Sequence, residues 1–193
     1  MQVCAEAGGA AHHRPMLRDL ALPDIRDDDT RQLDLVVGGL PIYGGKTVVG
    51  DATLRSPLSG NGEPRFSSHR SDGATFAQAR RDKQTTYPEL LEDDCRIVFL
   101  TLACEVGGRF SSECGDLVKR LVEHKASQQP EPLRGSFRVI LHRRWWGLLS
   151  VAVQRAVVGN LAGADWPCLG AFELPGLEEL LTHVDAPMPS RLR

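Results

Sequence analysis

KTVVGDATLRSP, residues Lys46 to Pro57, sets the architecture that we expect for this chain of 193 residues. The segment is rich in Val and Thr, which favour β-strands, and it carries one carboxylate, Asp51, in its second half. Because side chains alternate along a strand, Asp51 shares a face with Val49 and Thr53. A buried carboxylate is costly unless it is paired, hydrogen-bonded or bound to a metal. Asp51 is therefore either turned to solvent at a sheet edge or part of a functional site.

Apolar segments on both sides of this strand predict further strands. The sequence LDLVVGGLPIY ends at Tyr43, and the Gly-rich turn that follows predicts an antiparallel pair with Lys46 to Leu54. The sequence CRIVFLTLAC, from Cys95 to Cys104, is almost uninterrupted apolar sequence. Such a run is typical of a central strand that is buried on both faces.

Three helices are expected after the strand pair. The sequence ATFAQARRDKQTTYPELL is helical in character, and Pro88 divides it because proline cannot continue a helix. A clearly amphipathic helix begins at Ser111 or Ser112, followed by Glu113. A long helix then runs from about Leu133 to Leu161. We therefore predict an α/β fold with a small mixed β-sheet flanked by helices and a long C-terminal helix.

Length and composition predict one folded domain with two appended ends. A chain of this length can bury one core but not two full-sized ones. Residues 1–16 are small and polar and predict a flexible lead-in, residues 17–162 form the domain, and residues 163–193 form a Pro-rich tail. The formal net charge of -2 gives no global nucleic-acid signal, so any basic surface must come from local clustering.

The cysteines and the N-terminus predict an intracellular protein that has no membrane partner. The five cysteines are odd in number and never spaced as C-x-x-C, which suits reduced thiols. The N-terminus lacks the charged and apolar regions of a signal peptide, and no apolar run approaches membrane-spanning length.

Local clustering of basic residues occurs in the first half of the long helix. Its candidate nucleic-acid-binding residues are Arg134, Arg138, His142, Arg143 and Arg144. The first three are four residues apart and share one stripe of a helix. Basic residues beside aromatic ones can hold phosphates and stack on bases, and two tryptophans follow at positions 145 and 146. Tryptophans beside a Leu/Val-rich run more often anchor a core, which is the favoured interpretation of these two.

An ordered set of motifs adds a family resemblance. The motifs are LDLVVGGLPIYGG, DATLRSPL, ARRDKQTTYPEL and CEVGGRFSSE, and the resemblance spans roughly Leu17 to Ala162. The order of a strand with Asp34, a strand with Asp51 and a helix with Lys83, followed by a strand and a helix, resembles the PD-(D/E)xK, or restriction-endonuclease-like, core. The set is also similar to the region C-terminal to the reverse transcriptase in non-LTR retroelement polyproteins.

The resemblance implies a specific site and activity. Asp34 and Asp51 would hold Mg²⁺ or Mn²⁺, and Lys83 would help to activate water. Thr53 stands where the family's lysine is expected, so the lysine would have moved to the following helix. Possible supporting residues are Thr53, Tyr87 and Glu105. The implied function is a Mg²⁺-dependent DNA endonuclease derived from a retroelement, which nicks or hydrolyses a phosphodiester and is nuclear if active.

The chemistry also follows from the residues themselves. Hydrolysis of a phosphodiester needs hard oxygen ligands for the metal and a cation near the developing charge. Each residue taken singly also has a structural interpretation. Asp34 is compatible with a turn or the start of a strand, Lys83 with a solvated helix face, and Glu105 with an exposed strand end. Two alternatives remain open: a catalytically decayed nucleic-acid-binding module of the same fold, and an unrelated α/β interaction domain. The nuclease interpretation requires Asp34, Asp51 and Lys83 to converge in one cleft.

Overall fold

A four-stranded mixed sheet forms the centre of the computed structural model, which describes residues 1–23, 25–65, 68–92 and 96–162. The strands are β1 (Ala10–His13), β2 (Leu35–Gly38), β3 (Thr47–Arg55) and β4 (Ile97–Glu105), in the spatial order β1-β2-β3-β4. β1 and β3 pair antiparallel to β2, whereas β4 runs parallel to β3. The predicted α/β class and the antiparallel pairing of β2 with β3 are confirmed.

Gly50 lies in the middle of β3 because the sheet leaves no room there for a side chain. It pairs with Leu35 of β2 on one side and with Leu100 of β4 on the other. A Cβ atom added at this position would lie 2.9 Å from Leu102 Cδ1. The glycine therefore allows the close approach of the Leu102 side chain inside this strand.

β4 is an edge strand, and the prediction that it lies at the centre of the sheet is wrong. Its apolar sequence is explained by helices on both faces and by the segment that follows it, which closes the outer edge. The Ser111 amide donates to the carbonyl of Ala103, and the Ser111 hydroxyl donates to the carbonyl of Thr101. The Glu113 carboxylate accepts a hydrogen bond from the Thr101 amide. With its edge groups satisfied in this way, an edge strand can be as apolar as a central one.

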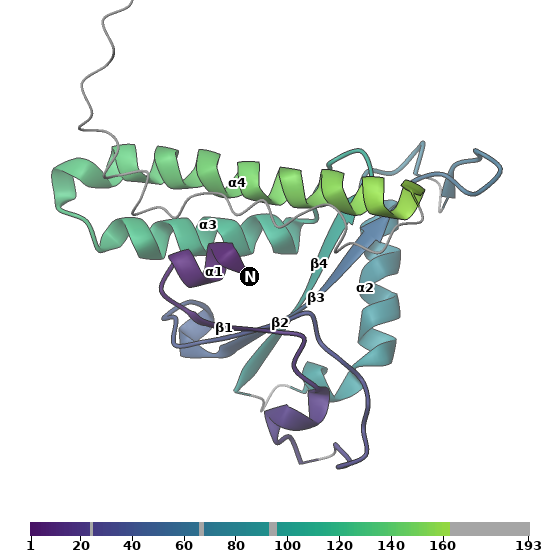
Figure 1. The fold of residues 1–193 in the computed structure, drawn as a ribbon, viewed down its shortest axis with the longest axis horizontal. Helices are drawn as coiled ribbons and strands as arrows, with labels where there is room; N and C mark the ends of the chain where they lie inside the picture. The colour runs from purple at the N-terminus through teal and green to yellow at the C-terminus, as the bar shows by residue number, and fades with distance from the viewer. Residues whose placement is uncertain (24, 66–67, 93–95, 163–193) are drawn as a thin grey trace, which may run out of the picture.

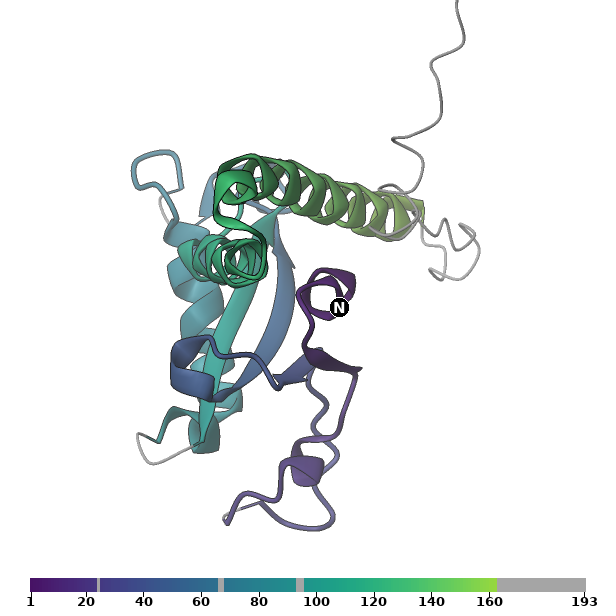
Figure 2. The same cartoon turned by 90° about the vertical axis from the view of Figure 1, so that its left-hand side faces the viewer.

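The helices divide between the two faces of the sheet (Figures 1 and 2). α2 (Ala74–Thr86) lies on one face, and the short 3₁₀ helix η4 (Pro88–Leu91) follows it, so Pro88 does divide the predicted helix. On the other face, α3 (Ser112–Ser127) and α4 (Glu131–Ala162) pack side by side. The predicted long C-terminal helix is confirmed as α4. Two further 3₁₀ turns are η1 (Leu17–Leu20) and η2 (Tyr43–Gly45). No helix in the part of the chain that the structure describes has the length and apolar character needed to cross a membrane.

Two buried clusters, one on each face, hold these layers together. Val48 belongs to the larger cluster, which packs under α3 and α4, while Val49 belongs to the smaller one with Tyr87 and Leu90. Adjacent residues of β3 thus face opposite layers, as the alternation along a strand requires. Asp51 is two residues after Val49, lies on the same face of β3 and so faces the layer that contains α2.

The first 16 residues differ from the flexible lead-in expected for them. Residues Gln2–Glu6 form helix α1, and β1 pairs with β2 along its full length. Val3, Cys4 and Ala7 are buried in the larger cluster. Elements of five and four residues are too short to show a periodic pattern, and they fold because of contacts with distant parts of the chain. The predicted tail, residues 163–193, lies outside the described residues.

Candidate active site

The site begins where β2 and β3 separate. The last paired residues are Leu35 and Gly50. Beyond this pair, the Asp34 side chain takes the place of a strand backbone: its Oδ2 accepts a hydrogen bond of 2.7 Å from the Ala52 amide. Asp34 is thereby fixed in the fork between the two strands, next to Asp51.

Asp51 and Lys83 form an ion pair inside this fork. Lys83, in the last turn of α2, places its Nζ 2.9 Å from Asp51 Oδ2. The Asp51 side chain is only 5% exposed, and that of Lys83 is 24% exposed. Apart from this ion pair, Asp51 Oδ2 has no hydrogen-bond partner in the described ranges. The two predicted carboxylates and the predicted lysine therefore converge at one place.

The electrostatics of the fork disfavour a full negative charge on Asp51. Burial raises the pKa of Asp51, and the Asp34 carboxyl group raises it further, while the Lys83 ammonium lowers it. The net effect is a raised pKa. A second cation beside Asp51 would relieve this destabilisation, which is the property expected of a site that receives a positively charged ligand.

Tyr87 adds a phenol to the same cluster. Its ring is buried, and its hydroxyl donates a 2.9 Å hydrogen bond to the carbonyl of Gln32. Burial and the nearby charges of Asp51 and Asp34 raise the pKa of Tyr87 to about 12. Tyr87 is therefore a protonated hydrogen-bond donor at neutral pH, and it ties the end of α2 to the segment that carries Asp34.

Arg31, which the sequence did not single out, holds Tyr87 in place. Its guanidinium donates to both Glu89 carboxylate oxygens and to the carbonyl of Thr86, and it also pairs with Asp29. The Arg31 Cζ atom lies 5.9 Å from the centroid of the Tyr87 ring. The only sequence signal was an acidic run around Asp29, which by itself is typical of a solvated turn.

Of the predicted supporting residues, Thr53 lies near Asp51 and Glu105 does not. Thr53 lies two residues beyond Asp51 and, together with Asp34, lines a mostly apolar cavity of about 420 Å³. Glu105 of β4 pairs in register with Arg55 of β3. Arg55 is four residues after Asp51, so Glu105 lies roughly 13 Å further along the sheet than Asp51. There Glu105 accepts a 2.6 Å hydrogen bond from the Thr75 hydroxyl. Glu105 is therefore not a member of the Asp51 cluster.

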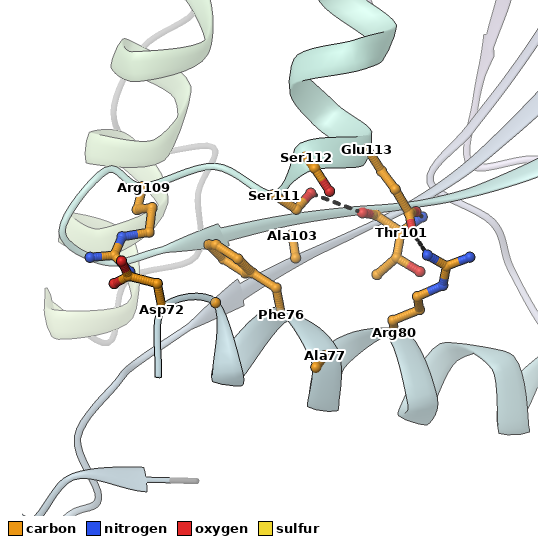
Figure 3. A pocket seen from close by; sticks show the side chains of 11 residues that line it. Asp72, Phe76, Ala77, Arg80, Thr101, Ala103, Arg109, Ser111, Ser112 and Glu113 are labelled. Carbon is orange, nitrogen blue, oxygen red and sulfur yellow. Dashed lines mark hydrogen bonds and ion pairs between the residues drawn. The ribbon is translucent and has the colours of Figure 1, made fainter. Parts of the chain in front are cut away.

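A cavity of about 690 Å³ lies between α2 and the start of α3, on the outer side of the edge strand β4 (Figure 3). Thr101, the register partner of Asp51, lines it between α2 and the start of α3. Its cations are already paired: Arg80 Nη1 lies 2.8 Å from Glu113 Oε1, and Arg109 pairs with Asp72. The cavity thus offers space next to the cluster without a surplus of positive charge.

The predicted basic residues of α4 lie in the layer on the opposite face of the sheet. Arg144 pairs with Glu6 at 2.7 Å, and these side chains are only 10% and 11% exposed. Arg134 donates to the carbonyl of Gln129. His142 Nε2 accepts a 3.0 Å hydrogen bond from Trp146 Nε1. None of these residues reaches Asp51, and Arg144 is part of the core packing.

The two tryptophans serve the core. Trp145 is fully buried, and its Nε1 donates a 2.8 Å hydrogen bond to Glu6. Trp146 packs edge-on against Phe110, with ring centroids 4.9 Å apart. Neither ring is presented for stacking on a base, so the core interpretation is confirmed.

The two carboxylates of the fork fit a small hard cation. No group of three or more His, Cys, Asp or Glu side chains arranged to hold a metal occurs within residues 1–162 as far as they are described. Mg²⁺ commonly takes only one or two protein carboxylates and completes its shell with water and substrate phosphate. Asp34 and Asp51 supply two carboxylates, and Oδ2 of Asp51 already has the Lys83 ammonium as its ion-pair partner.

Comparison with known proteins does not place the chain in a family. No protein-family model, curated protein or solved structure matches it significantly. The fold defines an α/β domain with a four-stranded mixed sheet that is covered by helices on both faces. Any more specific assignment depends on the arrangement of Asp34, Asp51 and Lys83.

Stability should respond to pH through Asp51. Because its pKa is raised in the folded state, the folded protein holds this proton more tightly than the unfolded chain. This proton contributes its full stabilisation below the pKa of Asp51 in the unfolded chain. The contribution is lost as the pH rises through the pKa of Asp51 in the folded protein. We expect Asp51→Asn to gain stability relative to the wild type as the pH increases from 3.5 to 7, measured by urea unfolding. Asp27→Asn, at an exposed position, is the control. If the stability of Asp51→Asn relative to the wild type fell with increasing pH, the raised pKa of Asp51 would be contradicted.

Proposed function

We propose that the protein is a Mg²⁺-dependent endonuclease-like domain that hydrolyses or nicks a DNA phosphodiester. The observation that carries this proposal is the convergence of Asp34, Asp51 and Lys83 in the fork between β2 and β3. The delivery of a lysine by the helix that follows β3 supports the resemblance to the PD-(D/E)xK core. An origin in a retroelement is part of the same proposal.

Each residue has a separate role in this proposal. Asp34 and Asp51 would hold the metal ion, which would supply a Lewis acid that polarises the phosphate and lowers the pKa of a water. Lys83, in the last turn of α2, would supply an ammonium group that stabilises the charge developing on the phosphate oxygens. Tyr87 positions the segment that carries Asp34 through its hydrogen bond to Gln32. The cavity beside Thr101 gives room for the strand that flanks the scissile phosphate.

A second candidate function is a nucleic-acid-binding domain of the same fold without catalysis. The ion pair between Lys83 and Asp51 favours it, because an ammonium group already compensates the carboxylate that a metal would need. The replacement of the expected lysine by Thr53 points in the same direction. This candidate predicts DNA binding that is indifferent to Mg²⁺.

Nicking of supercoiled plasmid separates the two candidates. The purified protein is expected to convert supercoiled plasmid to the open circular form with Mg²⁺ or Mn²⁺ and not with EDTA. Asp34→Asn should remove this activity because it removes a metal ligand, whereas Asp27→Asn, on an exposed loop, should retain it. Binding without nicking in either metal would favour the decayed module. Nicking that persists in Asp34→Asn would rule out the proposed site.

A further inference from the structure

A basic surface lies on α3 and α4, in the layer on the far side of the sheet from Asp51. A shallow groove of about 290 Å³ runs between these two helices. It is lined by Lys119, Val122, Glu123, Arg138, Val139, His142 and Arg143. Three cations and one carboxylate give this groove a net positive charge, although the chain as a whole carries a formal net charge of -2.

Two of the cations in this α3–α4 groove have no ion-pair or hydrogen-bond partner among the residues that the structure describes. Glu123 pairs with Arg138 at 2.8 Å, so these two charges compensate each other. Lys119 and Arg143 are exposed and make no ion pair or hydrogen bond with any residue in the described part of the chain. They come from different helices and line the same groove, which is the arrangement of a surface that awaits an anion.

We propose that the α3–α4 groove holds the phosphate backbone of a second nucleic-acid segment, so that the protein bridges two segments. This inference rests on the proposed function, because the first segment is the one bound at Asp34 and Asp51. The groove cannot serve that same contact, since the sheet and the layer of α3 and α4 separate it from the fork. Asp51 faces the layer that contains α2, so the sheet lies between it and the groove.

The lining favours a nucleic-acid backbone over other anions. The cations are exposed and no buried donor converges on a point, so the groove suits an extended polyanion better than a single small phosphate. A membrane-binding helix would present aromatic or leucine side chains beside its basic residues. In this groove Val139 is the one exposed apolar side chain, and both tryptophans of α4 pack inward.

A bridging assay tests the inference. A biotinylated 30-base-pair duplex is fixed to beads, the protein is added with Ca²⁺ in place of Mg²⁺ so that the carboxylates of the fork have a divalent cation to bind, and retention of a second, fluorescent duplex is measured. We expect retention with the wild type and a loss of roughly tenfold or more in Lys119→Ala/Arg143→Ala, because two phosphate contacts are removed. The slope of log affinity against log salt for the same variant should fall by about 2. Lys46→Ala/Arg96→Ala removes two exposed cations elsewhere and is the matched control.

The outcomes are separable from those of the nicking test, because the bridging assay measures retention of a second duplex and not hydrolysis, and because its variant lies in the groove and not in the fork. Retention that is equal in the wild type and in the groove variant would overturn the inference, whether it came from a dimer or from another surface. Sedimentation with anionic vesicles by the wild type, combined with no retention of the second duplex, would instead assign the groove to a membrane. Absence of nicking would refute the catalytic proposal and leave the bridging result interpretable.

Discussion

Asp51→Asn is expected to lower plasmid nicking by about 10³-fold or more, since it removes a metal ligand and leaves Lys83 without its carboxylate partner. The asparagine has nearly the same shape, so the packing of β3 against α2 should remain. Lys83→Met should lower the rate by about 10²-fold, because it removes the cation near the developing charge and leaves the two metal ligands. Initial rates of open-circle formation at saturating Mg²⁺ measure both effects.

The stability of the same variants makes this test decisive. The raised pKa of Asp51 means that the fold disfavours the charged carboxylate, so Asp51→Asn should unfold in urea no more easily than the wild type at pH 7. A loss of activity without a loss of stability is the signature of a functional carboxylate. Equal nicking by the wild type and Asp51→Asn would refute the site. An inactive and unfolded variant would indicate a structural role for Asp51.

Trp145→Ala is expected to reduce the free energy of unfolding by about 3–5 kcal/mol. The side chain is fully buried between α4 and the rest of the larger cluster, and its Nε1 donates to Glu6. Truncation would leave a cavity and remove a hydrogen bond to a carboxylate that is itself largely buried. Urea unfolding followed by circular dichroism measures the change.

Two further variants control this prediction. Trp145→Phe keeps most of the apolar contact and loses the hydrogen bond, so it should be less destabilising than the alanine variant and should remain folded. Leu133→Ala, at a position of α4 that is 55% exposed, should change the stability by less than about 0.5 kcal/mol. A small effect of Trp145→Ala together with reduced DNA binding would favour base contact, contrary to its burial.

Local sequence predicted those parts of the fold that depend on local physics. The Gly-rich turn after Tyr43 specified the β2–β3 pair, and Ser111 caps α3 through a hydrogen bond from the Cys114 amide. The alternation along β3 predicted the face that Asp51 shares with Val49 and Thr53. The convergence of Asp51 with Lys83 was implied by the family resemblance and was a condition of the nuclease interpretation.

Contacts between distant segments could not be predicted in this way. β4 reads as a central strand, since its apolar run does not reveal that Ser111 and Glu113 close its outer edge. Arg144 was grouped with the candidate nucleic-acid-binding residues of the long helix, and only its contact with Glu6 identifies it as part of the core packing. Lys119 escaped notice because it lies on a different helix from Arg143, and their proximity exists only in three dimensions.

The contact between Glu6 and Arg144 also has a consequence for the order of folding during synthesis. The two residues are 138 positions apart, so α1 has left the ribosome long before its partner on α4 exists. At translation rates of about 5–20 residues per second, the delay is roughly 7–30 s. During this interval Glu6 lacks its partners Arg144 and Trp145, and the larger cluster lacks the side chains that α4 contributes.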